Sequence, residues 1–194
     1  MNRVSILADA RLQGCSADVE RGLSTCAATL SIDDLQGLMD RANCAVFDSA
    51  MRDTGAESGT IWLANPERTH LTIGYSHVDQ NLVGRDQPLD EGLVSLVVAS
   101  ENGICENLVY QNEQHSKRID EEFHFVTCAM IAVPFYLGGN LRGVISFVRI
   151  KADEQAPDPP GFTADHLGKV QQLSSTVERL LNYRLLRILL GLQL

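Results

Sequence analysis

Cysteine and histidine are the side chains of this sequence with the widest chemical capacity, and their spacing is the first constraint on function. The five cysteines are odd in number, widely separated and form no C-x-x-C pair; they are Cys15, Cys26, Cys44, Cys105 and Cys128. This pattern argues against a disulfide framework and a zinc site, and it favours a reducing cytoplasm. No two of the histidines have the i, i+4 spacing of a helical metal site; they are His70, His77, His115, His124 and His166.

Other catalytic motifs are missing as well. The sequence contains no Ser-His-Asp grouping, no phosphate-binding glycine loop and no carboxylate pair at a recognised catalytic spacing. The Gly-Gly-Asn segment at 138–140 suits a hairpin turn, because glycine and asparagine tolerate positive φ. We therefore predict no catalytic residue, no metal and no cofactor.

The composition is typical of one globular domain. The chain has 194 residues, 44% of them hydrophobic and 21% charged, with a net charge of −9. This charge disfavours a nucleic-acid backbone or an anionic membrane surface as partner. The first residues lack the apolar core of a secretory signal, and no run approaches the roughly 18 apolar residues of a membrane span. We therefore expect a cytoplasmic protein.

The elements that must position any site begin with a helix and two strands. Residues 1–30 have weak patterning and indicate a helical or partly disordered leader. A helix is predicted from Ser31 to about Met51, because Asp34 stands at capping-box spacing and apolar residues follow at helical intervals. Residues 59–65 and 70–76 are rich in β-branched and aromatic side chains, which predicts a pair of strands.

A short helix and a short strand come next. Asp90 is placed to cap a helix with apolar residues from Leu93 to Val97, and Gly103 is placed to stop it. Residues 104–110 indicate a strand that runs into a loop. Residues 111–123 are polar, and they could hold one helical turn or remain a surface loop.

The last third of the sequence predicts a long hairpin and a long helix. Both faces of the second hairpin arm are largely apolar, so we expect this arm inside a sheet that is covered on both sides. Pro134 has no N–H group to donate, and it should lie at a bulge or where strand pairing lapses on one side. Thr163 caps the final helix, whose apolar stripe continues into a strongly apolar end that favours a partner.

This order of elements indicates an α+β protein, and it resembles the GAF domain family. Four segments between 32 and 185 carry the resemblance, in the family's order: "GTIWLAN" with "HLTIGYS", "LDEGLVSLVVASENGICENLV", "TCAMIAVPFYLGGNLRGVISFVR" and "FTADHLGKVQQLSSTV". The resemblance implies a GAF/PAS-like central antiparallel sheet flanked by N- and C-terminal helices. Members of the family are mostly cytoplasmic sensory or regulatory modules that bind a small molecule beside the sheet or serve to dimerise.

The resemblance also implies a binding pocket and a dimer. Carried over by position, the pocket would be lined by Ser95, Cys105, His115, Phe123, Thr127 and Phe147. A few polar groups among aromatic ones is typical of a small-molecule cavity. The alternative is that the serine and threonine satisfy nearby backbone and that the two phenylalanines are core. The helices near 31–50 and 163–190 would form a homodimer, which the apolar end of the last helix also favours.

Specialised members of the family differ from this sequence at their characteristic positions. The cyclic-nucleotide signature is broken, because Arg149 to Lys151 and Asp165-His166 replace its Asn-Lys and Asp-Glu pairs. There is no Cys-His pair to attach a bilin. The free methionine sulfoxide reductases use cysteines near the long hairpin, which raises the question for Cys105 and Cys128. However, that family's helix-start cysteine and "GHIACD" segment are absent, and no cation stands next to Cys105 to activate it.

We therefore predict a leader in residues 1–30, a GAF-like domain in 31–185 and the end of a signalling and dimerisation helix in 186–194. The leading hypothesis is a non-enzymatic sensory or regulatory domain that binds an unidentified small molecule and signals through dimerising terminal helices. One alternative is a structural dimerisation module without a physiological ligand. The other is a thiol-dependent enzyme similar to the free methionine sulfoxide reductases.

Overall fold

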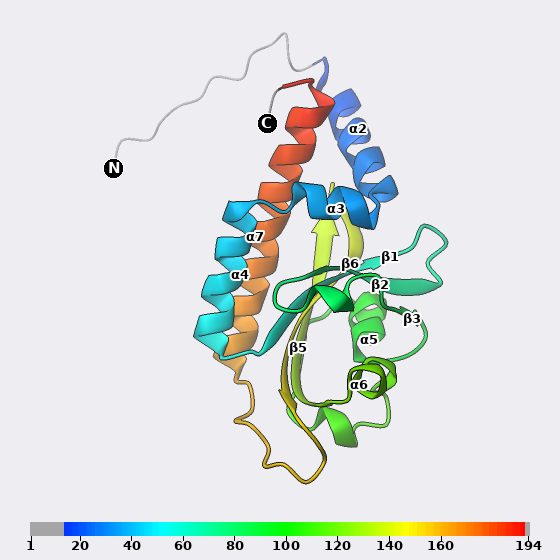
Figure 1. Ribbon diagram of the computed structural model, residues 1–194. Helices are drawn as coiled ribbons and strands as arrows, with labels where there is room; N and C mark the ends of the chain where they lie inside the picture. Colours follow the sequence, from blue (N-terminus) through cyan, green and yellow to red (C-terminus); the bar gives the residue numbers. More distant parts are fainter. Residues whose placement is uncertain (1–13, 193–194) are drawn as a thin grey trace.

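The computed structural model describes residues 14–192, which form a six-stranded antiparallel sheet with helices on both faces (Figure 1). The strand order is β3-β2-β1-β6-β5-β4. The strands are β1 (Ser58–Ala64), β2 (His70–Ser76), β3 (Asp86–Pro88), β4 (Ile104–Glu106), β5 (Val126–Leu137) and β6 (Asn140–Lys151). The predicted α+β class and central antiparallel sheet are confirmed.

Two groups of helices cover the sheet. One face packs against α2 (Ser16–Thr29), α3 (Ile32–Leu38), α4 (Arg41–Thr54) and α7 (Ala164–Leu189), of which α4 and α7 lie side by side (Figure 1). The other face packs against α5 (Leu93–Ser100), α6 (Arg118–Phe123) and the one-turn helices η1 (Gln80–Leu82) and η2 (Val109–Gln111). Helix α2 occupies half of the predicted leader, whose residues 1–13 lie outside the described residues.

The helix predicted from Ser31 to Met51 is divided in two. Ser31 and Asp34 form the expected capping box at the start of α3. The chain then leaves the helix at Met39, and Asp40 begins α4 by accepting hydrogen bonds from two backbone N–H groups of its first turn. Arg184 of α7 also donates to the Asp40 carboxylate at 2.6 Å. The break therefore follows from a second N-cap that the continuous apolar periodicity concealed.

The other helix boundaries agree in part with the prediction. Helix α5 starts after Gly92 without a side-chain cap, so Asp90 does not cap it, and the helix ends at the left-handed residue Glu101 instead of Gly103. The polar segment holds the short helix α6. Thr163 caps α7 as predicted, in a capping box with His166.

The two long strands form the predicted hairpin. Gly138 and Gly139 make its turn with positive φ values of 57° and 79°. Pro134 pairs with Val144 of β6 on one side, while on the other side the pairing with β4 stops at Ala132. There the Ser174 hydroxyl of α7 donates to the Pro134 carbonyl oxygen at 2.9 Å. Strand pairing thus lapses on one side of Pro134, as predicted.

Strand β6 lies between β1 and β5 and separates two hydrophobic cores. Ile145 and Phe147 point into the core under the helices α2, α3, α4 and α7. Val144 and Val148 point into the core on the α5 side. Both faces of β6 are therefore covered, which confirms the interpretation of its apolar pattern.

The apolar stripe of α7 is used within the chain. Its buried residues pack against the sheet and the neighbouring helices; they are Val170, Leu173, Val177, Leu181 and Leu185. The large apolar side chains that remain exposed lie near the end of the helix and just beyond it; they are Tyr183, Ile188, Leu189, Leu190 and Leu192. Among the described apolar residues of α7 and its end, these exposed ones remain available to a partner.

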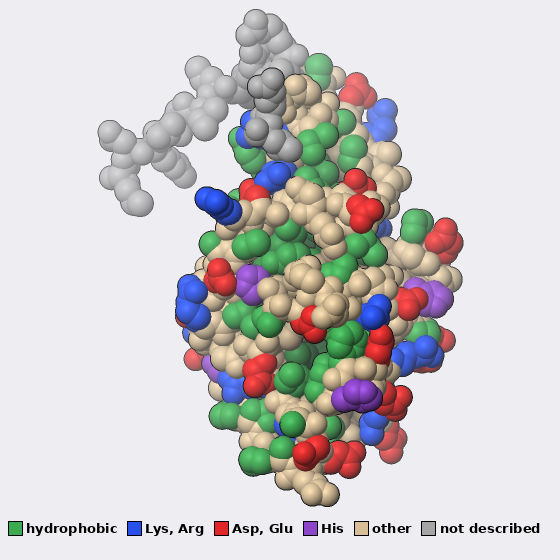
Figure 2. All heavy atoms as spheres, in the orientation of Figure 1, with side chains coloured by type: hydrophobic (Ala, Val, Ile, Leu, Met, Phe, Trp, Pro, Cys, Tyr) green, Lys and Arg blue, Asp and Glu red, His purple; other side chains and the backbone are tan. Residues whose placement is uncertain are grey.

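Within residues 14–192, no helix combines the length and the hydropathy that crossing a bilayer requires. On the face seen in Figure 2, Lys and Arg side chains are scattered among Asp and Glu side chains and gather into no basic patch.

A chain of polar contacts joins α4 to β2. The Tyr75 hydroxyl lies 2.9 Å from His77 Nδ1, and His77 Nε2 lies 2.9 Å from a carboxylate oxygen of Asp48. The Cys44 sulfur lies 3.6 Å from the same hydroxyl. Burial raises the pKa of Tyr75 well above its ordinary value, and Cys44 and Asp48 raise it further.

The raised pKa of Tyr75 predicts a loss of stability in alkali. The folded protein holds the phenolic proton more tightly than the unfolded chain, in which the pKa is about 10. The free energy of unfolding should therefore be unaffected by this group below about pH 10 and fall as the pH rises further. Tyr75→Phe should flatten this fall in urea titrations at several pH values, whereas Tyr183→Phe at the exposed tyrosine should not. An equal slope in wild type and Tyr75→Phe would contradict this account.

Gly143 of β6 allows the close approach of β1. A Cβ atom at this position would overlap the carbonyl oxygen of Trp62. We expect Gly143→Ala to lower the free energy of unfolding by about 1–3 kcal/mol, because the backbone must shift to relieve the overlap. The matched control is Gly168→Ala in α7, where the added methyl meets no atom within 4 Å and should raise stability by about 0.5–1 kcal/mol. Chemical denaturation of both variants measures the two effects.

Candidate functional site

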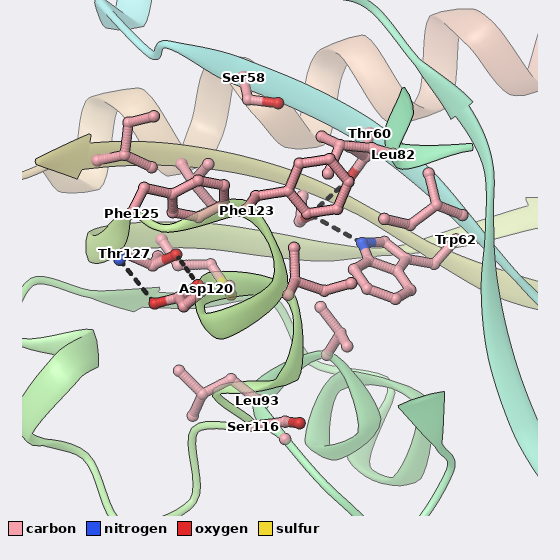
Figure 3. Close-up of a pocket in the computed structure, with 18 of the residues that line it drawn as sticks. Ser58, Thr60, Trp62, Leu82, Leu93, Ser116, Asp120, Phe123, Phe125 and Thr127 are labelled. Atoms are coloured by element: carbon pink, nitrogen blue, oxygen red, sulfur yellow. Dashed lines mark hydrogen bonds between the residues drawn. The ribbon is translucent and has the colours of Figure 1, made fainter. Parts of the chain in front are cut away.

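A cavity of about 230 Å³ lies between the sheet and the layer that contains α5 and α6 (Figure 3). Its floor consists of side chains from β1, β2, β5 and β6; these are Ser58, Thr60, Trp62, Ile73, Thr127, Met130, Ser146, Val148 and Ile150. Its roof comes from the start of α5, from α6 and from the loops; these residues include Val78, Leu82, Leu93, Val94, His115, Ser116, Ile119, Asp120, Phe123 and Phe125. The lining is mainly apolar, with a small number of polar groups, as in small-molecule sites.

One end of the cavity carries a hydrogen-bonded group on the sheet. Trp62 Nε1 donates to the Ser146 hydroxyl at 3.0 Å, and the Thr60 and Ser146 hydroxyls are 2.8 Å apart (Figure 3). All three residues are buried. The indole N–H is therefore already used inside the protein, and the Trp62 ring forms an aromatic wall.

A second polar group surrounds the carboxylate of Asp120 in α6. Its oxygens accept from the Thr127 backbone N–H at 2.8 Å and from the Thr127 hydroxyl at 2.7 Å (Figure 3). His115 Nε2 lies 3.2 Å from the carboxylate. Asp120 thereby fixes α6 to the beginning of β5, and it brings a buried acidic group to the cavity.

Two hydroxyl groups at the cavity are unpaired. Within the described part of the chain, neither Ser58 Oγ nor Ser116 Oγ has a hydrogen-bond partner, although both atoms are buried. Both serines line the cavity. Because buried polar atoms are normally hydrogen-bonded, these two are suited to contact a bound molecule.

Two ion pairs connect α6 to neighbouring segments above the cavity. Arg85 next to β3 pairs with Glu122 at 2.6 Å, and its guanidinium lies 5.6 Å from the ring centroid of Phe123. Arg118 pairs with Glu91, just before α5, at 3.1 Å. These side chains are largely exposed, so each pair contributes little stability. The roof is thus fastened mainly by Asp120 and by apolar packing.

The structure brings only some of the predicted pocket residues together. His115, Phe123 and Thr127 line the cavity. Ser95 is placed in a separate, more open hollow between α5 and α6, where its hydroxyl contacts the Pro88 carbonyl and the Gln87 amide.

Two of the predicted residues lie away from the cavity. Cys105 is exposed on the edge strand β4. Phe147 is fully buried in the core under α2, α3, α4 and α7. It follows Ser146, and neighbouring residues of a strand point to opposite faces of the sheet. The expectation that these two line the pocket is therefore corrected.

Sequence reasoning missed several lining residues. Thr60 and Trp62 alternate in the first predicted strand, and Ser146 is a single hydroxyl in the apolar run of β6. This alternation is a signal that could have identified the cavity face. Nothing in the sequence marks Asp120 as buried, because it stands in a polar segment with other acidic residues.

None of the five cysteines, all of which lie in the described range, lines the cavity. Partial desolvation of the sulfur and then the neighbouring Glu106 carboxylate raise the pKa of Cys105, although the residue as a whole is exposed, and burial also raises the pKa of Cys128. Reactive cysteines instead have a lowered pKa. Residues 14–192 also contain no group of three or more His, Cys, Asp or Glu positioned to hold a metal ion.

Solved structures share this fold at low sequence identity. A GAF domain of a phosphoenolpyruvate-protein phosphotransferase from Acinetobacter superposes with a TM-score of 0.57 at 14% identity, covering 95% of this chain and 99% of its own. The corresponding domain from Coxiella burnetii gives 0.59 at 12% identity, covering 90% and 95%. The free methionine-R-sulfoxide reductase of Neisseria meningitidis, solved with its substrate, gives 0.56 at 12% identity, covering 96% and 98%. At these identities the likeness shows the fold alone.

The sequence comparison gives the family. No curated protein matches the chain. The family model described as "GAF domain" matches residues 41–182, which is most of the chain and includes every strand of the sheet. The chain therefore belongs to the GAF domain family.

Proposed function

We propose that this protein is a non-enzymatic, cytoplasmic sensory or regulatory module that binds a small molecule in the cavity between the sheet and α6. The observation that carries this proposal is the mainly apolar cavity with two unpaired buried hydroxyls, Ser58 and Ser116. Its volume of about 230 Å³ is below the roughly 300–1,000 Å³ of drug-sized sites, so the ligand is metabolite-sized. The five free cysteines are compatible with a reducing compartment.

Signalling through the helices is part of this proposal. In strands β1 and β6, alternate side chains line the cavity, and the side chains between them point into the core under α4 and α7. A ligand that binds better to one arrangement of these strands would shift the packing of α4 and α7.

A thiol-dependent reductase is the less supported alternative. The fold likeness to a free methionine-R-sulfoxide reductase favours it. The placement of Cys105 and Cys128 outside the cavity, with raised pKa values, argues against it. A structural dimerisation module without a ligand is the other alternative, and the unpaired hydroxyls argue against that reading.

Filling the cavity tests ligand binding. Val148 of β6 lines the cavity, and we expect Val148→Phe to occupy part of its volume. Native mass spectrometry should detect a retained small molecule in the wild type, and a thermal-shift screen of metabolites should find compounds that raise its melting temperature. Val148→Phe should lose both signals while it stays folded.

The matched control is Leu108→Phe, which makes the same kind of change at an apolar side chain that is 48% exposed and does not line the cavity. This variant should keep the wild-type response. Retention of the ligand response in folded Val148→Phe would place binding elsewhere.

We also propose that the protein is a homodimer that uses its terminal helices, with the exposed end of α7 at the interface. At least half of the surface of Tyr183, Ile188 and Leu190 is exposed there, which favours association.

A charge at this end should weaken the dimer. We expect Ile188→Glu to raise the dimer dissociation constant at least about tenfold, since a buried, unpaired carboxylate is costly. Leu108→Glu, at an apolar residue of similar exposure on another surface, is the control. Light scattering across a concentration series measures both, and a wild type that stays monomeric at micromolar concentration would contradict the proposal.

A further inference from the structure

We propose that the cavity selects a small ligand with an aromatic or similarly flat apolar body and a cationic, or at least hydrogen-bond-donating, group, and that it rejects anions. Because it concerns the same cavity, this proposal rests on the proposed function. It adds the chemical class of the ligand.

The charges at the cavity have one sign. The formally charged residues of its lining are Glu57, Asp79 and Asp120, and no Lys or Arg belongs to the lining. His115 is the single lining residue that could become positive, and it contacts Asp120. A ligand anion would thus meet the buried Asp120 carboxylate, where repulsion is poorly screened, and also the more exposed carboxylates of Glu57 and Asp79.

Two of the cations near the roof already have carboxylate partners, and Lys117, which follows Ser116, lines the separate hollow between α5 and α6 and not the cavity. Arg85 pairs with Glu122, and Arg118 pairs with Glu91. An anionic ligand that recruited either guanidinium would have to compete with the carboxylate that already pairs with it. The lining therefore has no Lys or Arg of its own, and these two neighbouring arginines already have carboxylate partners.

The hydrogen-bonding groups show the same bias. The Trp62 N–H is donated to Ser146, and the Thr127 hydroxyl is donated to Asp120. Carboxylate oxygens, in contrast, can accept more than one hydrogen bond each and can donate none. These two side-chain donors are therefore used inside the protein, while carboxylate oxygens keep accepting capacity, which favours a ligand that brings donors. The unpaired hydroxyls of Ser58 and Ser116 can serve in either role.

The aromatic walls determine the shape of the body. Trp62, Phe123 and Phe125 line the cavity, and the two phenylalanine rings are 6.4 Å apart between centroids (Figure 3). A flat ring can pack against such walls, and a cationic group is attracted to the faces of aromatic rings. The small volume restricts this body to about one or two rings.

Three probes with one ring system and different charges test the proposal. They are tryptamine (cationic), 3-methylindole (neutral, with one N–H donor) and indole-3-acetate (anionic). Calorimetry with the full chain at one fixed pH and salt concentration should give the tightest binding for tryptamine and a dissociation constant at least about tenfold weaker for indole-3-acetate. Equal or tighter binding of indole-3-acetate would overturn the proposal, and so would the failure of all three probes to bind.

A variant assigns the selectivity to the cavity. Asp120→Asn should weaken tryptamine binding about tenfold, because the ammonium group of tryptamine loses a charged partner. It should change 3-methylindole binding little, because that probe has no charge. Asp33→Asn is the control with the same chemical change, at an exposed residue of α3 on the opposite face of the sheet from the cavity. An equal loss in both variants would assign the effect to net charge and overturn the proposal. If Asp120→Asn does not fold, the ranking of the three probes on the wild type decides.

The two proposals can fail separately. A retained ligand that proves to be an anion, and whose binding Val148→Phe abolishes, would overturn the ligand class and support the binding function. Loss of tryptamine binding in folded Val148→Phe would support both.

Discussion

The alternation of side chains along β6 is the constraint on which the rest of the structure depends. Hydrogen bonds to β1 on one edge and β5 on the other fix the register of this strand. A shift by one residue would place Ser146 in the apolar core under α4 and α7 and would expose Phe147 to the cavity. The buried hydroxyl would then lose its partners Thr60 and Trp62. The core under α4 and α7 and the candidate site therefore both require the same register of β6.

Much of the fold could be predicted because its signals are local. The turn at Gly138 and Gly139 and the caps at Ser31 and Thr163 depend on backbone geometry within a few residues. The division between α3 and α4 could not be predicted in the same way. Its cap, Asp40, stands within an unbroken helical periodicity, and part of its environment comes from Arg184, which is distant in sequence. Long-range partners of this kind have no local pattern.

The candidate site was less predictable than the fold. His115, Phe123 and Thr127 could be placed at the cavity from the order of elements. Successive residues of a strand point to opposite faces, however. An assignment that is wrong by one position therefore selects Phe147 instead of Ser146 or Val148. Asp120 could not be recognised, because its burial is created by the packing of α6 on the start of β5. The acidic lining of the cavity is therefore a property of the tertiary structure.

The same alternation connects the cavity to the helices. Ser146 contacts Trp62 at the cavity, while the next residue, Phe147, packs against Phe47 of α4 with 5.8 Å between the ring centroids. Phe47 also packs against Tyr75, whose hydroxyl contacts His77 and, through it, Asp48 of α4. If a bound ligand displaced β6 at Ser146, the adjacent residue Phe147 would move with the backbone and change its contact with Phe47 of α4. Such a movement transmits a signal only if α4 has a second packing position against α7, because close-packed cores change between discrete arrangements and do not deform continuously.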